Sequence, residues 1–261
     1  MAKSLKREQK NKREENWLHR RVHWRSAAIA LTIVTIAGVL ILNRGITIII
    51  SSDQYPTYAS MPIKEIVRGD ATKKQVIFTF DGGDGVQSAD KIMTVLAEHK
   101  VTGTFFLTGK FVEKNPILVR KMALSGNEIF NHTYDHPHLP ELSAEEIGRE
   151  LAMMDQTTER VSRYIPRKYF RAPYGDRDQR VLAAAQAAGY ESIYWTVDAR
   201  DWQEPEGETD ASVKARILST LAPGNIYLMH IGDNITGNIL DSVFTEIEKR
   251  GYKIVSLTQG L

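Results

Sequence analysis

Residues 75–85 read QVIFTFDGGDG, a run of strand-forming apolar residues that ends in an acidic, glycine-rich turn. The same arrangement, a short apolar run followed by polar residues, recurs six more times along the chain. Helical patterns separate most of these runs, and alternation of this kind predicts parallel β–α units. The expected strands are Gln75–Phe80, Thr102–Leu107, Glu128–Asn131, Lys168–Arg171, Ser192–Val197, Ile226–Met229 and Lys253–Ser256.

The segments between the runs carry apolar residues at three- and four-residue spacing, which is typical of amphipathic helices. The clearest is residues 143–164, which opens with Ser143 and Glu146 in the spacing of a capping box. We therefore expect an α/β fold of about seven parallel strands, as a barrel or as an open doubly wound sheet. The other expected helices are Ser88–His99, Pro116–Leu124, Arg177–Ala188, Ala211–Leu221 and Ile239–Arg250.

Composition excludes several classes of protein. The 261 residues are 42% apolar and 25% charged, which is ordinary for a globular protein. Cysteine is absent, so disulfides, cysteine zinc sites and thiol nucleophiles are excluded. Residues 1–25 hold nine Lys or Arg against three Glu, a net charge of +6, and the remainder carries −4. A mildly acidic body argues against nucleic acid as a partner.

The first 50 residues predict a membrane anchor. Residues 26–42 are apolar and uncharged, and as a helix they would extend roughly 25 Å. The basic residues precede this run, which predicts that 1–25 is a cytoplasmic tail and that the rest is extracytoplasmic. We expect a transmembrane anchor at 26–50, a linker at 51–72 and a catalytic domain at 73–261. The alternative is a cleaved signal peptide and a secreted protein.

Polar clusters follow five successive strands of the predicted sheet. In a barrel, side chains at the carboxyl ends of parallel strands converge on one site. Asp81 follows the first strand, and His132 and His136 follow the third at a spacing that would bring both imidazoles to one cation on a helical turn. Arg171 follows the fourth strand and is able to clamp a carboxylate. Two further clusters, around Asp198 and His230, follow the fifth and sixth strands.

In order and spacing, these clusters resemble the five motifs of the polysaccharide deacetylases, carbohydrate esterase family four. The resemblance covers about residues 73–261 and implies a distorted (β/α) barrel that removes acetyl groups from N-acetylglucosamine polymers or acetylxylan. The matching stretches are Thr79-Phe-Asp81-Gly-Gly, His132-Thr-Tyr-Asp-His136, Arg171-Ala-Pro-Tyr174-Gly175, Asp198-Ala-Arg-Asp201-Trp202 and Leu228-Met-His230.

The resemblance also implies roles for these residues. His132 and His136 would hold a divalent metal, foremost zinc, although cobalt, nickel and iron suit the same ligands. Asp81 would take a proton from a metal-activated water, with Arg171 orienting its carboxylate.

The leaving group and the acetyl pocket involve the remaining motif residues. His230 would protonate the departing amine while Asp198 holds its imidazole. A backbone N–H near Tyr174 would stabilise the oxyanion. Trp202 and Leu228 would wall the acetyl pocket.

One position departs from the family pattern. The family has two adjacent aspartates in its first motif, of which the second is a metal ligand, and here that position is Gly82. Asp84, two residues on, would supply the missing carboxylate, or else merely stabilises the turn. We therefore hold two hypotheses. The first is a membrane-anchored deacetylase of acetylated cell-wall polysaccharide, foremost peptidoglycan, and the second is a weak or inactive wall-binding module of the same fold.

Overall fold

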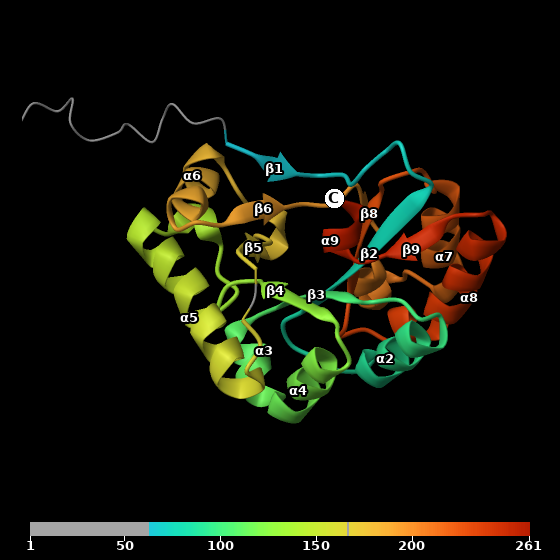
Figure 1. The fold of residues 1–261 in the computed structure, drawn as a ribbon, viewed down its shortest axis with the longest axis horizontal. Coiled ribbons are helices and arrows are strands. Elements are labelled where there is room, and N and C mark those ends of the chain that lie inside the picture. Colours follow the sequence, from blue (N-terminus) through green and yellow to red (C-terminus); the bar gives the residue numbers. More distant parts are fainter. Residues whose placement is uncertain (1–62, 166) are drawn as a thin grey trace, which may run out of the picture. The chain divides into compact units, whose positions relative to one another are not determined.

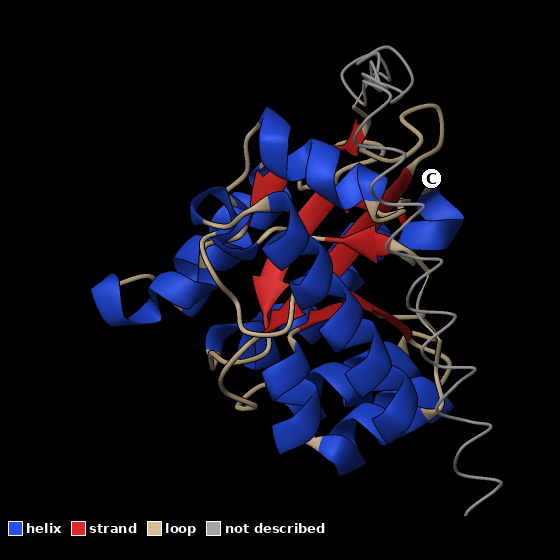
Figure 2. Cartoon of the chain, turned by 90° about the vertical axis from the view of Figure 1, so that its left-hand side faces the viewer, coloured by secondary structure: helices blue, strands red, loops and turns tan. Residues whose placement is uncertain are grey.

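The computed structural model describes residues 63–165 and 167–261, in which a curled sheet of parallel strands carries helices on its outer side (Figures 1 and 2). The strand order is β1-β6-β5-β4-β3-β2-β8-β7, and β9 also pairs with β2. The strands are β1 (Glu65–Ile66), β2 (Gln75–Gly82), β3 (Thr104–Leu107), β4 (Glu128–Asn131), β5 (Tyr169–Phe170), β6 (Glu191–Ile193), β7 (Val197–Asp198), β8 (Ile226–His230) and β9 (Lys253–Val255).

The helices follow the strands in alternation, as the sequence predicts. The α-helices are α2 (Ala89–Glu98), α3 (Gly109–Lys114), α4 (Pro116–Leu124), α5 (Ala144–Ser162), α6 (Gln179–Ala187), α7 (Asp210–Ser219), α8 (Ile235–Lys249) and α9 (Leu257–Gly260). The described residues also form the short 3₁₀ helices η3 (Leu139–Glu141), η4 (Pro173–Gly175) and η5 (Asp201–Glu206). The capping box of Ser143 and Glu146 is present at the start of α5. Helices α3 and α9 were not predicted, because six and four residues are too short to display a helical period.

The parallel sheet confirms the predicted α/β class, with two differences in the strands. Strand β1 lies in the segment predicted as a linker. The single strand expected at 192–197 is two strands, because the backbone changes partner there. The Tyr194 N–H donates to Ile66 of β1, whereas the Thr196 N–H donates to Ile226 of β8, each at 2.8–2.9 Å. The switch between the two sides of the sheet lies at Trp195, whose ring stacks on that of Tyr194 at 3.8 Å between centroids.

The predicted segments of the amino-terminal part lie mostly outside the described residues. The tail at 1–25 and the anchor at 26–50 are not described, and the predicted linker at 51–72 is described only from residue 63. Within it, β1 pairs with β6. In the described part of the chain, no helix combines the length and the apolar composition that crossing a membrane requires.

Strand β2 lies at the centre of the core, since seven of its eight residues are buried. On its helix-covered side, the Phe78 ring stacks on Tyr227 of β8 at 4.8 Å and meets Phe244 of α8 edge-on at 5.0 Å. Phe80 continues the same row against Phe105 of β3. Because Phe78 and Phe80 point to this side, the alternation of the strand turns Thr79 and Asp81 to the opposite side.

A histidine clasp joins α2 to α8 at the outer surface. The ring nitrogens of His99 lie 3.1 Å from Asp241 Oδ1 and 3.1 Å from Glu248 Oε2, and the side chain is only 11% exposed. Burial lowers the pKa of His99, but the hydrogen bonds to Asp241 and Glu248 outweigh it, and the net pKa is raised above 6.5. Only the imidazolium can donate from both nitrogens, so the clasp is complete in the charged form.

Replacing His99 by glutamine is expected to remove a pH-dependent part of the stability, of about 1 kcal/mol, because the carboxylates of Asp241 and Glu248 are 64% and 43% exposed and solvent screens them. Because the folded-state pKa is raised, this contribution is complete below the unfolded pKa of 6.5 and is lost as the pH rises through the folded value. Urea unfolding of the wild type and of His99→Gln at about pH 6 and about pH 9 measures it. His138→Gln is the control, since its ion pair with Asp176 is half exposed. An equal cost of His99→Gln at both pH values would contradict the clasp.

Candidate active site

The register of β2 and β8 brings two predicted site residues together. Asp81 pairs with His230 and Thr79 with Leu228 across these parallel strands. Residues two apart on a strand face the same side, so all four side chains lie on the face of the sheet opposite Phe78 and Phe80. The predicted base and the predicted acid therefore stand side by side at the carboxyl ends of neighbouring strands.

Arg171, directly after β5, is completely buried and fixes the Asp81 carboxylate. One guanidinium nitrogen, Nη1, donates to Asp81 Oδ1 at 2.7 Å and to Thr79 Oγ1 at 2.8 Å. The guanidinium also lies 4.1 Å from the Phe106 ring centre, a cation–π contact. Asp81 is itself buried, so its orientation depends on this arginine, as the sequence predicts.

His132 and His136 meet at the second oxygen of Asp81. His132 Nε2 lies 3.5 Å from Asp81 Oδ2 and 3.2 Å from His136 Nε2. The His132 Nδ1–H donates to the Arg171 carbonyl at 2.9 Å, which leaves Nε2 with its lone pair toward His136. Burial lowers the pKa of His132. Burial, and then the repulsion that two protonated imidazoles would exert on each other, lowers the pKa of His136 to about 4. Both imidazoles are therefore neutral near pH 7.

The two histidines approach in a loop and not in the helical turn that the sequence predicted. Thr133 and His136 have φ values of 66° and 60°, a left-handed conformation that interrupts any helix. The side chain of Asn131 accepts from the Thr133 N–H at 2.9 Å and holds the first turn of the loop. Glu150 of α5 accepts from the backbone N–H groups of residues 134 and 135 at 2.9 and 2.8 Å. Asn131 and Glu150 are thus loop-positioning residues that the sequence analysis missed.

The chemistry of this donor set fits part of a divalent-metal site. Two neutral imidazoles, one of them oriented by a backbone carbonyl, are common zinc ligands with their usual outer partner. Yet among residues 63–165 and 167–261, no group of three or more His, Asp or Glu is placed to hold a metal ion. Asp84 is exposed, and in the described residues no hydrogen bond or ion pair joins it to His132 or His136.

Position 82 faces apolar side chains. A Cβ at Gly82 would lie 2.7 Å from Leu107 Cδ2 and 2.9 Å from Ile231 Cδ1. An aspartate in this backbone would have to displace those side-chain ends. Glycine at 82 therefore agrees with the local packing, in addition to removing a ligand.

Asp201, and not Asp198, holds the imidazole of His230. The His230 Nδ1–H donates to Asp201 Oδ1 at 2.9 Å, and its backbone N–H donates to Asp201 Oδ2 at 2.6 Å. The predicted partner, Asp198, instead accepts from the Arg200 N–H at 2.8 Å and from Trp202 Nε1 at 3.4 Å. The reason is the turn at Arg200, where φ is 62° and the chain doubles back so that η5 begins beneath β8.

The electrostatics of this pair favour a charged imidazole. Burial lowers the pKa of His230, but the charge and the hydrogen bond of Asp201 outweigh it and raise the pKa to about 9. In return, the His230 charge and hydrogen bonds hold the pKa of Asp201 below its usual value in spite of burial. Because Nδ1 is engaged, the Nε2 proton is the one that His230 can give away.

The remaining predicted residues surround these groups. Tyr174 has a φ of 60° in η4, is 61% exposed, and its ring lies 4.4 Å from that of His136. Trp202 in η5 is 48% exposed, whereas Leu228 is buried in β8 on the same face as Asp81. Two exposed aromatic side chains near a cluster of buried polar groups suit a sugar ring, which presents apolar faces and polar edges.

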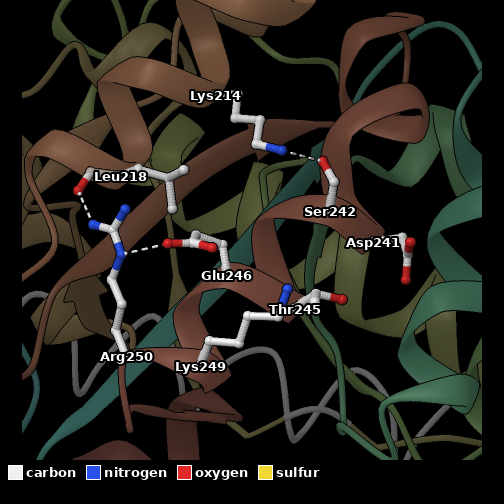
Figure 3. Close-up of a pocket in the computed structure, with 8 residues that line it drawn as sticks. All are labelled: Lys214, Leu218, Asp241, Ser242, Thr245, Glu246, Lys249 and Arg250. Carbon is white, nitrogen blue, oxygen red and sulfur yellow. Dashed lines mark hydrogen bonds and ion pairs between the residues drawn. The ribbon is translucent and has the colours of Figure 1, made fainter.

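A hollow of about 500 Å³ lies elsewhere, between α7 and α8 (Figure 3). In it, Lys214 donates to Ser242 at 2.9 Å, and Arg250 pairs with Glu246 at 2.9 Å. None of the predicted site residues lines it. We assign it no part in the chemistry.

Comparisons with known proteins agree with the motifs. A polysaccharide deacetylase family model matches residues 68–193. The peptidoglycan-N-acetylmuramic acid deacetylase of Bacillus subtilis (strain 168) is 31% identical over 189 residues, 72% of either chain. A chitooligosaccharide deacetylase of Sinorhizobium fredii is 33% identical over 211 residues, 76% of this chain and 97% of the relative. A CE4-family pseudoenzyme from Bacillus anthracis superposes with a TM-score of 0.72 at 29% identity, covering 77% of this chain and 70% of the other.

The chain belongs to the polysaccharide deacetylase family, the CE4 carbohydrate esterases, which confirms the predicted family and hydrolase class. The curled parallel sheet agrees with the barrel expected of such a protein.

The pH profile tests which aspartate acts on His230. We expect kcat on an acetylated sugar oligomer to fall as the pH rises through about 9, where His230 loses its proton. Asp201→Asn removes the charge that opposes burial, so the alkaline limb should move to lower pH. Asp198→Asn is the matched control and should leave the position of the limb unchanged. A limb that moves with Asp198→Asn and not with Asp201→Asn would overturn the assignment.

Proposed function

We propose that this protein is a metal-dependent hydrolase that removes acetyl groups from cell-wall polysaccharide containing N-acetylglucosamine, foremost peptidoglycan. The observation that carries the proposal is the set of imidazoles around Asp81: His132 Nε2 lies 3.5 Å from its carboxylate and 3.2 Å from His136 Nε2, and His230 is its register partner on β8. A fixed carboxylate beside two neutral imidazoles and a charged one provides a base, metal ligands and an acid in one place. The peptidoglycan and chitooligosaccharide deacetylases among the relatives support the substrate class.

His132 and His136 would hold the metal, foremost zinc, through Nε2. When bound, the cation would polarise the acetyl carbonyl and lower the pKa of a water molecule. Asp81 would accept the proton of that water at Oδ2, since Oδ1 is engaged by Arg171. Arg171 would keep the carboxylate in this orientation throughout, because its buried guanidinium has few other positions.

Stabilisation of the oxyanion and protonation of the leaving amine would use residues that follow other strands of the sheet. A backbone N–H near Tyr174 would donate to the oxyanion that develops on the acetyl group. His230 would then give its Nε2 proton to the departing amine, and Asp201 would stabilise the imidazolium beforehand. Trp202 and Leu228 would bound the acetyl group on the side of β8.

The location that we propose is the cell membrane, with the catalytic domain outside and residues 1–25 inside. The apolar run at 26–42 and the +6 charge of the preceding tail support this proposal. An anchor would hold the domain next to the cell-wall polymer. A domain secreted after cleavage would reach the same polymer from solution.

Acetate release from purified peptidoglycan tests the function. The full chain, stripped of metal and reloaded with zinc, should release acetate, and Asp81→Asn should reduce the rate by about 10²–10⁴-fold because it removes the base. Asp90→Asn, an exposed aspartate of α2, is the control. No metal-dependent release from peptidoglycan or from chitooligosaccharide would contradict the proposal.

The second candidate is a weak or inactive wall-binding module, which Gly82 and its apolar surroundings favour. The CE4 pseudoenzyme from Bacillus anthracis is a structural neighbour that supports this reading. Binding of the chain to peptidoglycan without acetate release, with or without zinc, would establish it.

Asp84→Ala tests how the metal site is completed. If the exposed turn bends so that Asp84 becomes a ligand, the variant should bind zinc at least about tenfold more weakly, because one charged ligand is lost. Isothermal titration of zinc into metal-free protein measures the affinity, with Asp90→Ala as the control for a lost surface charge. An unchanged affinity would remove Asp84 from the site.

A further inference from the structure

Asp233 is a buried carboxyl group that the reaction above does not use. It lies between β8 and α8, three residues after His230, and is 7% exposed. Its Oδ1 accepts from the Thr236 N–H at 2.8 Å and so caps the start of α8. Its Oδ2 is buried, and no donor within residues 63–165 and 167–261 forms a hydrogen bond to it. Burying a carboxylate oxygen without a hydrogen bond costs free energy of folding.

The neighbour that Asp233 can reach is Asp201. Thr236 links the two side chains, because its N–H donates to Asp233 Oδ1 at 2.8 Å and its hydroxyl donates to Asp201 Oδ2 at 2.5 Å. Contact with Asp201 is also among the causes that raise the pKa of Asp233. Two ionised carboxylates cannot form a hydrogen bond, so one of them must carry a proton.

The proton belongs to Asp233. Asp201 already accepts from the backbone and the ring of His230, from Thr236 and from the Trp202 N–H, and four donors favour the ionised form. Asp233 accepts from a single N–H. Burial and the charge of Asp201 raise the pKa of Asp233 to about 7.

We propose that Asp233 is a positioning residue for His230: as a neutral acid it donates a hydrogen bond from Oδ2 to Asp201 and fixes the carboxylate that holds the imidazole. This proposal rests on the proposed role of His230 as the acid. It accounts for the orphaned oxygen, and it extends the line of contacts to Asp233–Asp201–His230.

Charge decides when this contact forms. The titratable groups that face Asp233 are Asp201 of η5 and His230 of β8, and Asp81 of β2 faces His230 in turn. Ser88, at the start of α2, donates its hydroxyl to the Asp233 carbonyl and carries no charge. Loss of the Asp233 proton would place two negative charges next to each other and break the contact.

Two substitutions separate positioning from helix capping. Asp233→Asn keeps the cap and offers an amide N–H to Asp201, so it reproduces the neutral acid. Asp233→Ser keeps a capping oxygen but is too short to reach Asp201. Asp178→Ser is the matched control. Asp178 caps α6 in the same way, through a bond from the Val181 N–H at 2.8 Å, and no carboxyl group is bonded to it in the described part of the chain. Thermal unfolding of all three variants reports the capping cost.

In the full-length protein, kcat of Asp233→Asn should be within about twofold of the wild type, whereas Asp233→Ser should lose about tenfold, a part of the roughly 10²–10⁴-fold that a general acid supplies. The wild-type profile should also have an inflection near pH 7 that Asp233→Asn lacks. Equal kcat and equal profiles for Asp233→Ser and the wild type would overturn the proposal and leave Asp233 a helix cap.

A spectroscopic measurement keeps the test independent of activity. With nitrogen-15 histidine in the full-length protein, the wild-type His230 imidazole should titrate with a second inflection near pH 7, from Asp233, that Asp233→Asn abolishes. If no acetate is released but this inflection is present, the proposed function fails and the contact stands. A single inflection in both proteins would refute the contact.

Discussion

The site depends on one buried ion pair, Arg171 with Asp81. Removing two charges from water costs several kcal/mol per ion, so such a pair persists only where other partners surround it. Arg171 has those partners in Thr79, in the carbonyls of residues 193 and 194 and in the Phe106 ring. Since these groups come from β2, β3 and the end of β6, the arginine holds together several strand ends. Loss of either ion would leave an uncompensated buried charge, at about 3–5 kcal/mol.

The sequence was sufficient for most of the strands and for the edge of the sheet at which the site residues meet, because both depend on local patterns. Apolar runs mark buried parallel strands, and the side chains that follow them must meet at one edge of the sheet. The sequence did not identify which aspartate binds the His230 imidazole. Asp198 and Asp201 are equally acidic and three residues apart, and only the left-handed turn at Arg200 decides which one lies beneath β8. The contacts of Asn131 and Glu150 with the histidine loop likewise join segments whose approach no local pattern records.

Backbone strain is concentrated in the loops of the site. Of the six non-glycine residues with positive φ in the described chain, Lys100 and Arg163 lie at helix ends. The other four lie in the site loops: Thr133, His136, Tyr174 and Arg200. Such conformations cost of order 1 kcal/mol or more each, and they persist because surrounding hydrogen bonds impose them. Glu150 and Asn131 do so for the histidine loop, and the paired Arg177 and Glu65 brace the Tyr174 turn through the Gly175 carbonyl. The strained loops therefore lower the stability of the folded chain while they preorganise the site.

Gly82 argues against catalysis, whereas the other motif residues are present, and the contacts among those residues decide how strongly their presence supports catalysis. Asp81, Arg171 and Asp201 are buried, and each satisfies the others or the backbone, so an inactive descendant would keep them for stability alone. Their presence is therefore weak support for catalysis. The informative side chains are those that the fold does not need. His136 is held mainly by contacts with His132 and Tyr174, and the Nε2 of His230 has no structural partner in the described chain. Neutral imidazoles turned toward each other and a free, charged Nε2 contribute little to folding, which makes them the stronger argument for a working deacetylase.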